Sequence, residues 1–288
     1  MTKKKENKIN KVANEFTGIP LDDDFPGKTK INNLFDVTDK TAIVTGAAHG
    51  LGRQIALGLA SFGADVVVAD INVDGAEETA KSIEEIGRSA LVANVNVTNP
   101  TEINEMVNKT LEKFGKIDIC FNIPGINIRK PTLDLTLDEF NMIIDTNLKG
   151  LFYCAQAVGK VMVEQKRGKI INMSSIMGII GNHNQCAYAA SKAGIIQFTK
   201  VMALEWAEEN VQVNTIAPGY HMTVGPLAKQ YIETPEGKAM IEGIMAKIPQ
   251  NRMAHSSEII GPALFLASDA SNYVTGSVIV PDGGWTAQ

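Results

Sequence analysis

From residue 40 onward, short apolar runs alternate with longer segments of mixed polar and apolar character. Runs of four to six mostly apolar residues predict buried strands, and seven of them occur: Thr41–Val44, Asp65–Ala69, Ala90–Ala93, Ile117–Phe121, Lys169–Met173, Val211–Ile216 and Ser277–Val280. Helical segments fill the gaps, and two of them begin with helix-start signals, at 99–102 and 136–139. The alternation predicts an α/β fold with a doubly wound, seven-stranded, mainly parallel sheet and helices on both faces.

Two segments depart from this alternation. Residues 1–33 are polar and lysine-rich, without the periodicity of a helix or strand. We therefore expect a polar N-terminal arm there, and one domain over residues 34–288. The alternative to a flexible or peripherally docked arm is an arm that takes part in subunit contacts. Within that domain, residues from about 224 to 248 carry Gly and Pro between weakly amphipathic patches. This pattern predicts two short helices that form a mobile substrate lid, and an ordinary surface insertion is the alternative.

Composition and charge narrow the classes of function. With 288 residues, the chain can bury the core of one large domain. Its formal charge of −5 argues against nucleic acid as a partner. It has no window of about 18 uninterrupted apolar residues, which a membrane span would need, and no secretory signal. Three cysteines without CxxC spacing predict reduced thiols: Cys120, Cys154 and Cys186. We expect a cytoplasmic protein without a metal ion, membrane or nucleic-acid partner.

A glycine-rich turn follows the first expected strand and leads into a helical segment. The stretch reads Thr45-Gly46-Ala47-Ala48-His49-Gly50-Leu51-Gly52. Glycines at positions 46, 50 and 52 allow a tight turn, close approach of the backbone to a pyrophosphate, and close packing of helix on strand. The pyrophosphate then rests on the helix N-terminus. The turn therefore predicts a dinucleotide site, with a purely structural turn as the alternative.

Asp70 ends the second expected strand, 70 − 46 = 24 residues after the first glycine. A carboxylate at this place accepts hydrogen bonds from the adenosine ribose and repels a 2′-phosphate. His49 and Ile71 stand where a phosphate would require arginine or lysine. NAD is therefore the expected cofactor, although a carboxylate that only stabilises a turn is the alternative reading of Asp70.

Ser175, Tyr188 and Lys192 have the spacing that a proton-transfer site needs. Tyr188 and Lys192 are four residues apart, so on a helix their side chains share one face. A phenol has a pKa near ~10. An ammonium about 6 Å away favours the phenolate by roughly 3 kcal/mol at an effective dielectric of about 20, or ~2 pK units. Tyrosine then works as an acid or base near neutral pH.

Together these motifs resemble the short-chain dehydrogenase/reductase family, in its single-domain branch with a Rossmann fold, from about residue 35 to 288. The separation 188 − 175 = 13 matches the family interval, and the motifs fall in family order: the glycine turn, Asp70, Asn147, Ser175, Tyr188, Lys192, Asn214–Gly219 and Val280–Gly284. The resemblance implies catalytic roles. Tyr188 exchanges a proton with the reacting oxygen, Ser175 holds that oxygen, and Lys192 lowers the tyrosine pKa and binds the nicotinamide ribose.

Asn147 is implied to hold a water that links Lys192 to solvent, and a helix-interior asparagine satisfied by backbone is the alternative. The resemblance also implies a homotetramer, assembled through the helices that contain Asn147 and Tyr188. It places cofactor contacts at Gly46, His49, Gly50, Leu51, Gly52, Asp70, Ile71, Asn96, Val97, Asn122, Gly125, Tyr188, Lys192, Pro218, Gly219, His221 and Thr223.

Two positions depart from the family pattern. Asn96 stands where aspartate commonly faces the adenine amino group, and its amide oxygen still accepts a hydrogen bond. Ile123-Pro124 replaces the common Asn-Ala between Asn122 and Gly125. Since proline lacks a backbone N–H, we expect changed hydrogen bonding in this loop rather than lost activity.

The substrate side is expected to use Arg129 and His183 beside Ser175 and Tyr188. Arg129 follows a strand end, where ligands of open α/β sheets bind, and a guanidinium there holds a carboxylate bidentately. The alternative to ligand binding for Arg129 and its neighbour Lys130 is a solvated side chain on the surface. For His183 the alternative is a local hydrogen bond at the rim.

The pattern at 125–131 resembles gluconate 5-dehydrogenase-like members of the family. The expected function is an NAD-dependent oxidoreductase that transfers a hydride between nicotinamide and a secondary alcohol or ketone, on a polyol or a sugar acid such as gluconate. The alternatives are a 3-oxoacyl thioester reductase and a dinucleotide-sensing protein without turnover.

Overall fold

Seven parallel strands form the central sheet of the computed structural model, which describes residues 34–223 and 234–288. Their order across the sheet is β3-β2-β1-β4-β5-β6-β9, with bounds β1 Thr41–Thr45, β2 Asp65–Asp70, β3 Ala90–Asn94, β4 Ile119–Asn122, β5 Gly168–Met173, β6 Val211–Ile216 and β9 Val278–Ile279. The expected doubly wound, seven-stranded fold is confirmed. The expected arm at 1–33 and the first part of the expected lid, 224–233, lie outside the described residues.

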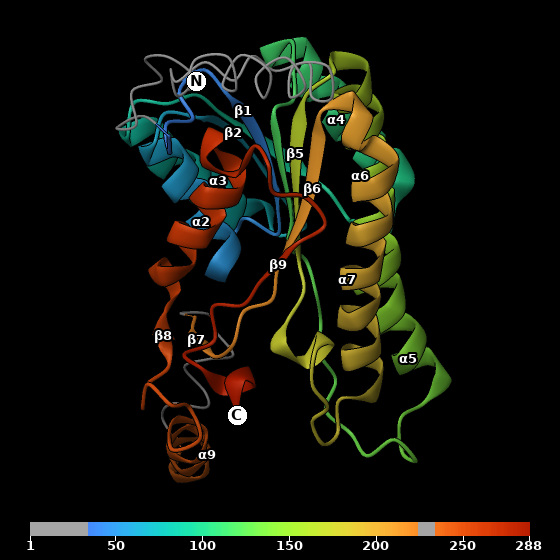
Figure 1. The fold of residues 1–288 in the computed structure, drawn as a ribbon, viewed down its shortest axis with the longest axis vertical. Coiled ribbons are helices and arrows are strands. Elements are labelled where there is room, and N and C mark those ends of the chain that lie inside the picture. Colours follow the sequence, from blue (N-terminus) through green and yellow to red (C-terminus); the bar gives the residue numbers. More distant parts are fainter. Residues whose placement is uncertain (1–33, 224–233) are drawn as a thin grey trace, which may run out of the picture. The chain divides into compact units, whose positions relative to one another are not determined.

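Helices cover both faces of the sheet (Figure 1). On one face lie α2 (Gly50–Ser61), α3 (Val73–Glu85) and α10 (Ile260–Ala267), and on the other lie α4 (Pro100–Phe114), α6 (Gly150–Gln165) and α7 (Cys186–Trp206). Strand residues alternate between the two cores, because successive side chains of a strand point to opposite faces. Ala42 and Val44 belong to the first core, and Ile43 between them belongs to the second.

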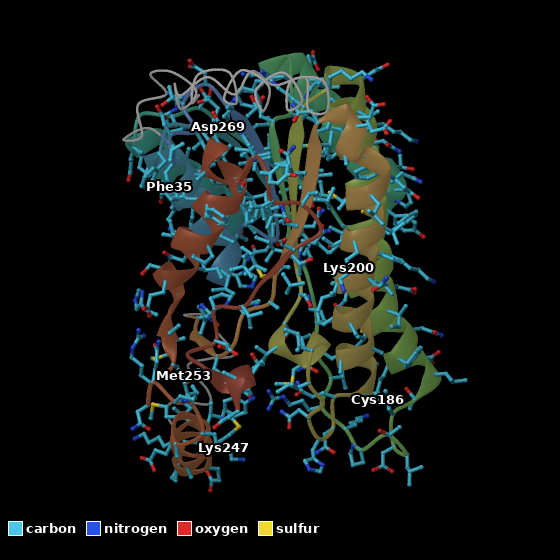
Figure 2. All side chains as sticks on the ribbon, viewed as in Figure 1. Phe35, Cys186, Lys200, Lys247, Met253 and Asp269 are labelled. Atoms are coloured by element: carbon cyan, nitrogen blue, oxygen red, sulfur yellow. The ribbon has the colours of Figure 1, made fainter. Side chains whose placement is uncertain are left out.

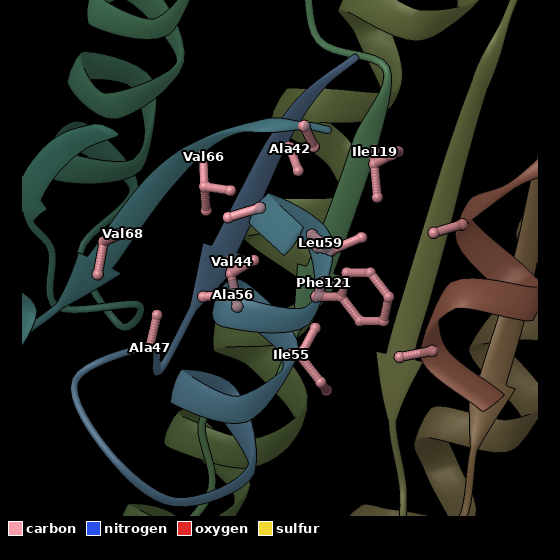
Figure 3. Close-up of a cluster of buried hydrophobic side chains, with 14 of the residues drawn as sticks. Ala42, Val44, Ala47, Ile55, Ala56, Leu59, Val66, Val68, Ile119 and Phe121 are labelled. Carbon is pink, nitrogen blue, oxygen red and sulfur yellow. The ribbon is translucent and has the colours of Figure 1, made fainter. Parts of the chain in front are cut away.

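The first core gathers around Phe121 of β4 (Figure 3). Its ring is fully buried beside Ile55 and Leu59 of α2. Burying each such side chain stabilises the fold by roughly 1.5–3 kcal/mol. This packing holds α2 on β1 and β4, and so fixes the position of the glycine turn that precedes α2.

Both expected helix starts are present. Helix α5 (Leu137–Ile144) begins with a complete capping box between Thr136 and Glu139. Helix α4 begins after Asn99, whose side chain accepts a hydrogen bond from the Thr101 N–H, and Pro100 occupies its first turn. Each cap satisfies a backbone N–H that the helix itself leaves unpaired.

A π-helical turn, η2 (Asp145–Lys149), joins α5 to α6 without a break. The sequence analysis expected a helix here but not this widened turn. Such turns occur frequently at functional sites, and this one contains Asn147, which is fully buried.

Beyond the carboxyl ends of the strands lies a second, two-stranded sheet. It pairs β7 (His221–Met222) with β8 (Ala254–His255), and α9 (Pro235–Met245) lies in the chain between them. Tyr220 packs against Trp285 with ring centres 5.0 Å apart and the ring planes tilted by 60°. This assembly faces α5 and the start of α7 in Figure 1, at the end of the sheet where ligands of such folds bind. None of the described helices is long and apolar enough to cross a bilayer.

Candidate active site

A cavity of about 910 Å³ opens at the carboxyl ends of the strands. It brings together sixteen of the residues that the sequence analysis assigned to the cofactor: Gly46, His49, Gly50, Leu51, Gly52, Asp70, Ile71, Asn96, Val97, Gly125, Tyr188, Lys192, Pro218, Gly219, His221 and Thr223. Figure 2 shows Cys186 at the start of α7, toward this end of the sheet, whereas Asp269 lies at the opposite end. Within residues 34–223 and 234–288, no group of His, Cys, Asp and Glu side chains is arranged to hold a metal ion.

The glycine turn has the shape that a pyrophosphate cradle requires. Gly46 and Gly50 have φ values of +71° and +57°, a region that other residues rarely adopt. A Cβ on Gly52 would lie 1.9 Å from the Gly46 carbonyl oxygen, so only glycine allows α2 to approach the turn this closely. The His49 side chain, at the N-cap of α2, makes no capping hydrogen bond. The first residues of α2 line the cavity, so their N–H groups can serve there as donors for an anion.

Asp70 is 7% exposed and lines the same cavity. Its Oδ2 accepts the Ala48 N–H at 3.0 Å and its Oδ1 accepts the Asn72 N–H at 2.9 Å. The carboxylate thus holds the glycine turn and the start of α3 together. Arg53, the nearest arginine along the chain, pairs with Glu78 of α3 at 3.4 Å rather than with Asp70.

Asn96 lines the cavity, but its amide oxygen is already in use. Oδ1 accepts both the Thr98 N–H at 3.0 Å and the Thr98 hydroxyl at 2.8 Å. An amide oxygen has two lone pairs. A further bond to an adenine amino group would therefore compete with Thr98, which the sequence analysis did not single out.

Ser175, Tyr188 and Lys192 meet at the inner end of the cavity. Ser175 caps a short 3₁₀ helix, η3 (Ile176–Gly178), through the Met177 N–H at 3.2 Å. Lys192 is 3% exposed, and its Nζ lies 5.7 Å from the centre of the Tyr188 ring. A Cβ on Gly178 would lie 2.7 Å from the Lys192 carbonyl, so this glycine lets η3 pack directly on α7.

The acid–base properties of the pair differ from the expectation. Burial raises the pKa of Tyr188, while a hydrogen bond with Ser175 and the charge of Arg129 act to lower it. Burial also lowers the pKa of Lys192 to about 8. The expected fall of the Tyr188 pKa beside Lys192 is therefore not found, because desolvation of the phenolate outweighs the nearby charges.

Both polar atoms of the Asn147 side chain form hydrogen bonds within the protein. Its Oδ1 accepts the Ile126 N–H at 2.8 Å, and its Nδ2 donates to the Ile126 carbonyl at 3.0 Å and to the Ser191 hydroxyl at 3.1 Å. Ser191 in turn donates to the Tyr188 carbonyl at 2.7 Å. Ser191, which the sequence analysis missed, thus links the π-helical turn to the helix that carries Tyr188.

Asn122 does not line the cavity. It is 2% exposed, and its Nδ2 donates to the Asn172 side chain at 2.9 Å, beneath the cavity floor. The neighbouring Pro124 does line the cavity and lies close to Gly46, since a Cβ on Gly46 would meet the proline ring at 3.3 Å. The departure at Ile123-Pro124 therefore packs the loop against the glycine turn.

A smaller cavity of about 150 Å³ adjoins the first and shares Ser175, Tyr188 and Gly219 with it. Arg129 lines this smaller cavity, as expected for a substrate ligand. Lys130 is instead engaged by Glu139 through an ion pair, and its N–H donates to the Asn184 carbonyl. His183 is exposed and lines neither cavity.

The sequence analysis missed other residues of the large cavity: Val95, Ile126, Met142, Asp145, Thr146, Met173 and Ser174. They carry no motif of their own. Val95, Met173 and Ser174 lie at or just after strand ends, and Ile126 lies in the loop after β4. Met142 lies on α5, and Asp145 and Thr146 lie in the π-helical turn.

Comparison with known proteins points to one family. A family model described as "Enoyl-(Acyl carrier protein) reductase" matches residues 46–286. The chain is 38% identical to the 3-oxoacyl-(acyl-carrier-protein) reductase of Thermotoga maritima, over 85% of this chain and 97% of that one. It is 36% identical to the 5-keto-D-gluconate 5-reductase of Escherichia coli, over 88% and 98% of the two chains.

Among solved structures, a gluconate 5-dehydrogenase of Burkholderia cenocepacia in complex with NADP and tartrate superposes with a TM-score of 0.82. It is 31% identical, with 89% of this chain and 98% of that one covered. The chain belongs to the short-chain dehydrogenase/reductase family, the NAD(P)-dependent oxidoreductases that interconvert CH–OH and carbonyl groups.

Proposed function

We propose that this protein is an NAD-dependent dehydrogenase/reductase of a sugar acid or a closely related polyhydroxy acid. The observation that carries the proposal is the place of Arg129. Its side chain lines the same small cavity as Ser175 and Tyr188. A carboxylate held there leaves a carbon chain of the same molecule beside the Tyr188 hydroxyl, because an arginine fork binds carboxylates in a fixed, bidentate geometry.

Two relatives support this substrate class. The similar protein of Escherichia coli is a 5-keto-D-gluconate reductase, and the similar structure from Burkholderia cenocepacia is a gluconate dehydrogenase with tartrate, itself a hydroxy diacid. The guanidinium of Arg129 supplies the recognition that such acids need.

The chemistry at the reacting oxygen falls to Tyr188 and Ser175. The nicotinamide supplies the hydride in reduction and accepts it in oxidation. With a raised pKa, Tyr188 carries its proton at neutral pH and gives it to the oxygen of the ketone as that oxygen gains negative charge. The Ser175 hydroxyl donates to the same oxygen and fixes its position.

Lys192 positions the cofactor and the residues around it, and does not itself transfer the proton to the ketone oxygen. Its ammonium donates to the Met173 carbonyl at 2.8 Å, at the end of β5. The remaining two N–H bonds of the ammonium are available to ribose hydroxyls in the large cavity that Lys192 lines. Asn147 and Ser191 hold the loop at Ile126 and the helix of Tyr188 in register around it.

Asp70 supports NAD over NADP. A 2′-phosphate would lie beside a carboxylate that two backbone N–H groups fix in place. The neighbouring Ile71 is 68% exposed and offers no positive charge. The Burkholderia cenocepacia structure contains NADP, so in this chain the preference depends on Asp70 rather than on family membership.

A second function, reduction of a 3-oxoacyl thioester, is favoured by the similarity to the Thermotoga maritima enzyme. The small cavity argues against it, since the guanidinium of Arg129 that lines it suits an anion better than an acyl chain.

We further propose that the protein assembles as a homotetramer through α6 and α7. Phe152 of α6 and Leu204 of α7 are 36% and 81% exposed, and exposed apolar side chains on neighbouring elements favour an interface. Light scattering on the eluting protein should give about four times the 31.0 kDa chain mass.

The function is tested by a panel of substrates followed at 340 nm. The panel contains 5-keto-D-gluconate, a neutral polyhydroxy ketone and acetoacetyl thioester, each with NADH and with NADPH. We expect the highest kcat/KM with the keto acid and NADH. A higher kcat/KM with acetoacetyl thioester would replace the sugar-acid proposal with the second function.

A further inference from the structure

Gln185 is a buried polar side chain whose acceptor has no partner in the described part of the protein. It is 3% exposed and lies directly before α7. Its backbone carbonyl accepts the Ala189 N–H at 2.8 Å, but its side chain caps no helix N–H. The amide oxygen Oε1 is buried and forms no hydrogen bond within residues 34–223 and 234–288. A buried acceptor of this kind destabilises the fold until a donor reaches it.

This side chain lines the small cavity together with Arg129, Ser175 and Tyr188. Gln185 is the N-cap residue of α7, and Tyr188 lies in the first turn, three residues further along the chain. Because both side chains line the small cavity, a ligand whose reacting carbon lies beside Tyr188 can present a neighbouring group to Gln185.

The rest of the small cavity defines what such a group can be. Among the described residues that line it, Arg129 is the one charged side chain and none is a carboxylate. The Tyr220 ring, which also lines this cavity, packs against Trp285 with ring centres 5.0 Å apart. The cavity thus combines a cation with an unpaired acceptor.

We propose that Gln185 determines substrate specificity: its Oε1 accepts a hydrogen bond from a hydroxyl group one or two carbons from the reacting carbon of a polyhydroxy acid. The inference rests on the proposed function and deepens it, because it states which part of the acid is recognised besides the carboxylate at Arg129. A 3-oxoacyl thioester places a methylene group next to the reacting carbon and its thioester carbonyl two carbons away; neither group donates a hydrogen bond, so the acceptor stays unpaired. A site built to hydrogen-bond a hydroxyl group discriminates strongly against analogues that lack it.

The test combines a variant of Gln185 with deoxy substrates. Gln185→Met keeps the length of the side chain and removes its amide. The substrates are 5-keto-D-gluconate and analogues that each lack one hydroxyl, at a carbon one or two positions from the ketone carbon. We expect the wild-type kcat/KM to fall about 10–100-fold on one of these analogues, the loss typical of a buried hydrogen bond. On that analogue, Gln185→Met should match the wild type.

On the parent keto acid, the kcat/KM of Gln185→Met should be about 10–100-fold below that of the wild type. The loss from the variant and the loss from the missing hydroxyl should then not add up, as expected for two groups in direct contact. Its retained activity on the deoxy analogue shows that the variant is folded. Gln197→Met, at an exposed position of the same helix, is the matched control and should behave as the wild type on every substrate.

The outcomes separate this inference from the function on which it rests. If the wild type reduces the keto acid, but Gln185→Met loses the same factor on the parent and on every deoxy analogue, the assignment of Gln185 is wrong and the function stands. If the wild type reduces acetoacetyl thioester and no polyhydroxy acid, both are wrong.

Discussion

Lys192 and Tyr188 lie on one face of α7 with the lysine Nζ 5.7 Å from the centre of the tyrosine ring, yet the lysine donates to the Met173 carbonyl. The ammonium thus lies beside the ring without a direct bond to the phenol oxygen. Because burial raises the pKa of Tyr188 and lowers that of Lys192 to about 8, the site holds the phenol protonated at neutral pH. In this state Tyr188 can give its proton to the oxygen of a ketone.

The pH dependence of the two directions follows from the raised Tyr188 pKa. Reduction requires the phenol, so this group should not limit kcat/KM between about pH 6 and pH 8. Oxidation requires the phenolate, whose fraction rises tenfold for each pH unit below the pKa. Its kcat/KM should therefore rise with pH over the same range, in steady-state assays at 340 nm. A flat profile for oxidation would show that the phenolate is already formed at pH 6.

Replacing Asp70 should change the choice of cofactor. Asp70→Asn removes the charge and keeps one oxygen for the backbone N–H groups of Ala48 or Asn72. Since the repulsion of a 2′-phosphate disappears, the ratio of kcat/KM for NADPH to that for NADH should rise at least about tenfold. Asp74→Asn, an exposed acidic residue in the first turn of α3, is the control. An unchanged ratio in Asp70→Asn would place the ribose contact elsewhere.

Arg129 should be needed for acidic substrates only. Arg129→Met removes a charge-assisted bond to the carboxylate, which is typically stronger than a neutral one. The KM for a keto acid should rise about 10–100-fold, while the KM for a neutral polyhydroxy ketone changes little. Lys130→Met tests the adjacent cation, which is engaged by Glu139. Equal effects of Arg129→Met on acidic and neutral substrates would exclude a carboxylate contact.

The same arginine acts on the tyrosine. Because the charge of Arg129 lowers the pKa of Tyr188, its removal should move the rise of the oxidation rate toward higher pH. The profile of Arg129→Met, recorded on a neutral polyol, separates this effect from the binding of a carboxylate. A profile that coincides with that of the wild type would contradict the coupling.

Lys169 of β5 offers a test of stability far from the site. It is 8% exposed, and burial lowers its pKa to about 8, against an ordinary value near ~10.4. The unfolded chain therefore binds more protons than the folded one between these values, so stability rises with pH over that window. Below about pH 8 the cost of burying the charge is fully present.

Lys169→Met removes this dependence. Relative to the wild type, the variant should gain stability most at pH 7, and the difference should shrink toward pH 10, as measured by urea unfolding. It loses a hydrogen bond to Ser271 at both pH values, so that loss does not mimic the trend. Lys160→Met, exposed on α6, should show no such trend. A difference independent of pH would mean that Lys169 is equally protonated in both states.

The strands were predictable because each is buried on both faces and reads as a short apolar run. The ends of all seven expected strands lie within two residues of those observed. Asp70 was placed correctly at the end of β2 for the same reason. The glycine turn was recognisable because positive φ angles and close backbone contacts demand glycine at fixed positions.

The amide side chains were not predictable in the same way. Asn122 and Asn147 form hydrogen bonds with residues far along the chain, whose approach depends on tertiary structure: Asn172, and Ile126 with Ser191. Asn96 instead bonds to Thr98, two residues away. The sequence shows that an amide is present but not which donors reach it. The π-helical turn around Asn147 has no distinctive pattern of apolar residues either.

Electrostatic partners were the least predictable. Spacing on a helix placed Lys192 beside Tyr188 correctly, but the balance between desolvation and charge depends on burial, which spacing does not give. The effect of Arg129 arises across a gap of 188 − 129 = 59 residues. The unpaired oxygen of Gln185 likewise emerged only from the packing around it.

The most direct measurement is the turnover of Tyr188→Phe with the best keto acid of the panel and NADH, followed at 340 nm. We expect kcat to fall about 10²–10⁴-fold, the usual contribution of a general acid, while the Kd for NADH, from fluorescence titration, stays within about threefold, because the ring that shapes the cavity remains. Tyr273→Phe, fully exposed on the surface, is the control. A Tyr188→Phe enzyme within about twofold of the wild-type kcat would contradict the assignment of Tyr188 as the proton donor.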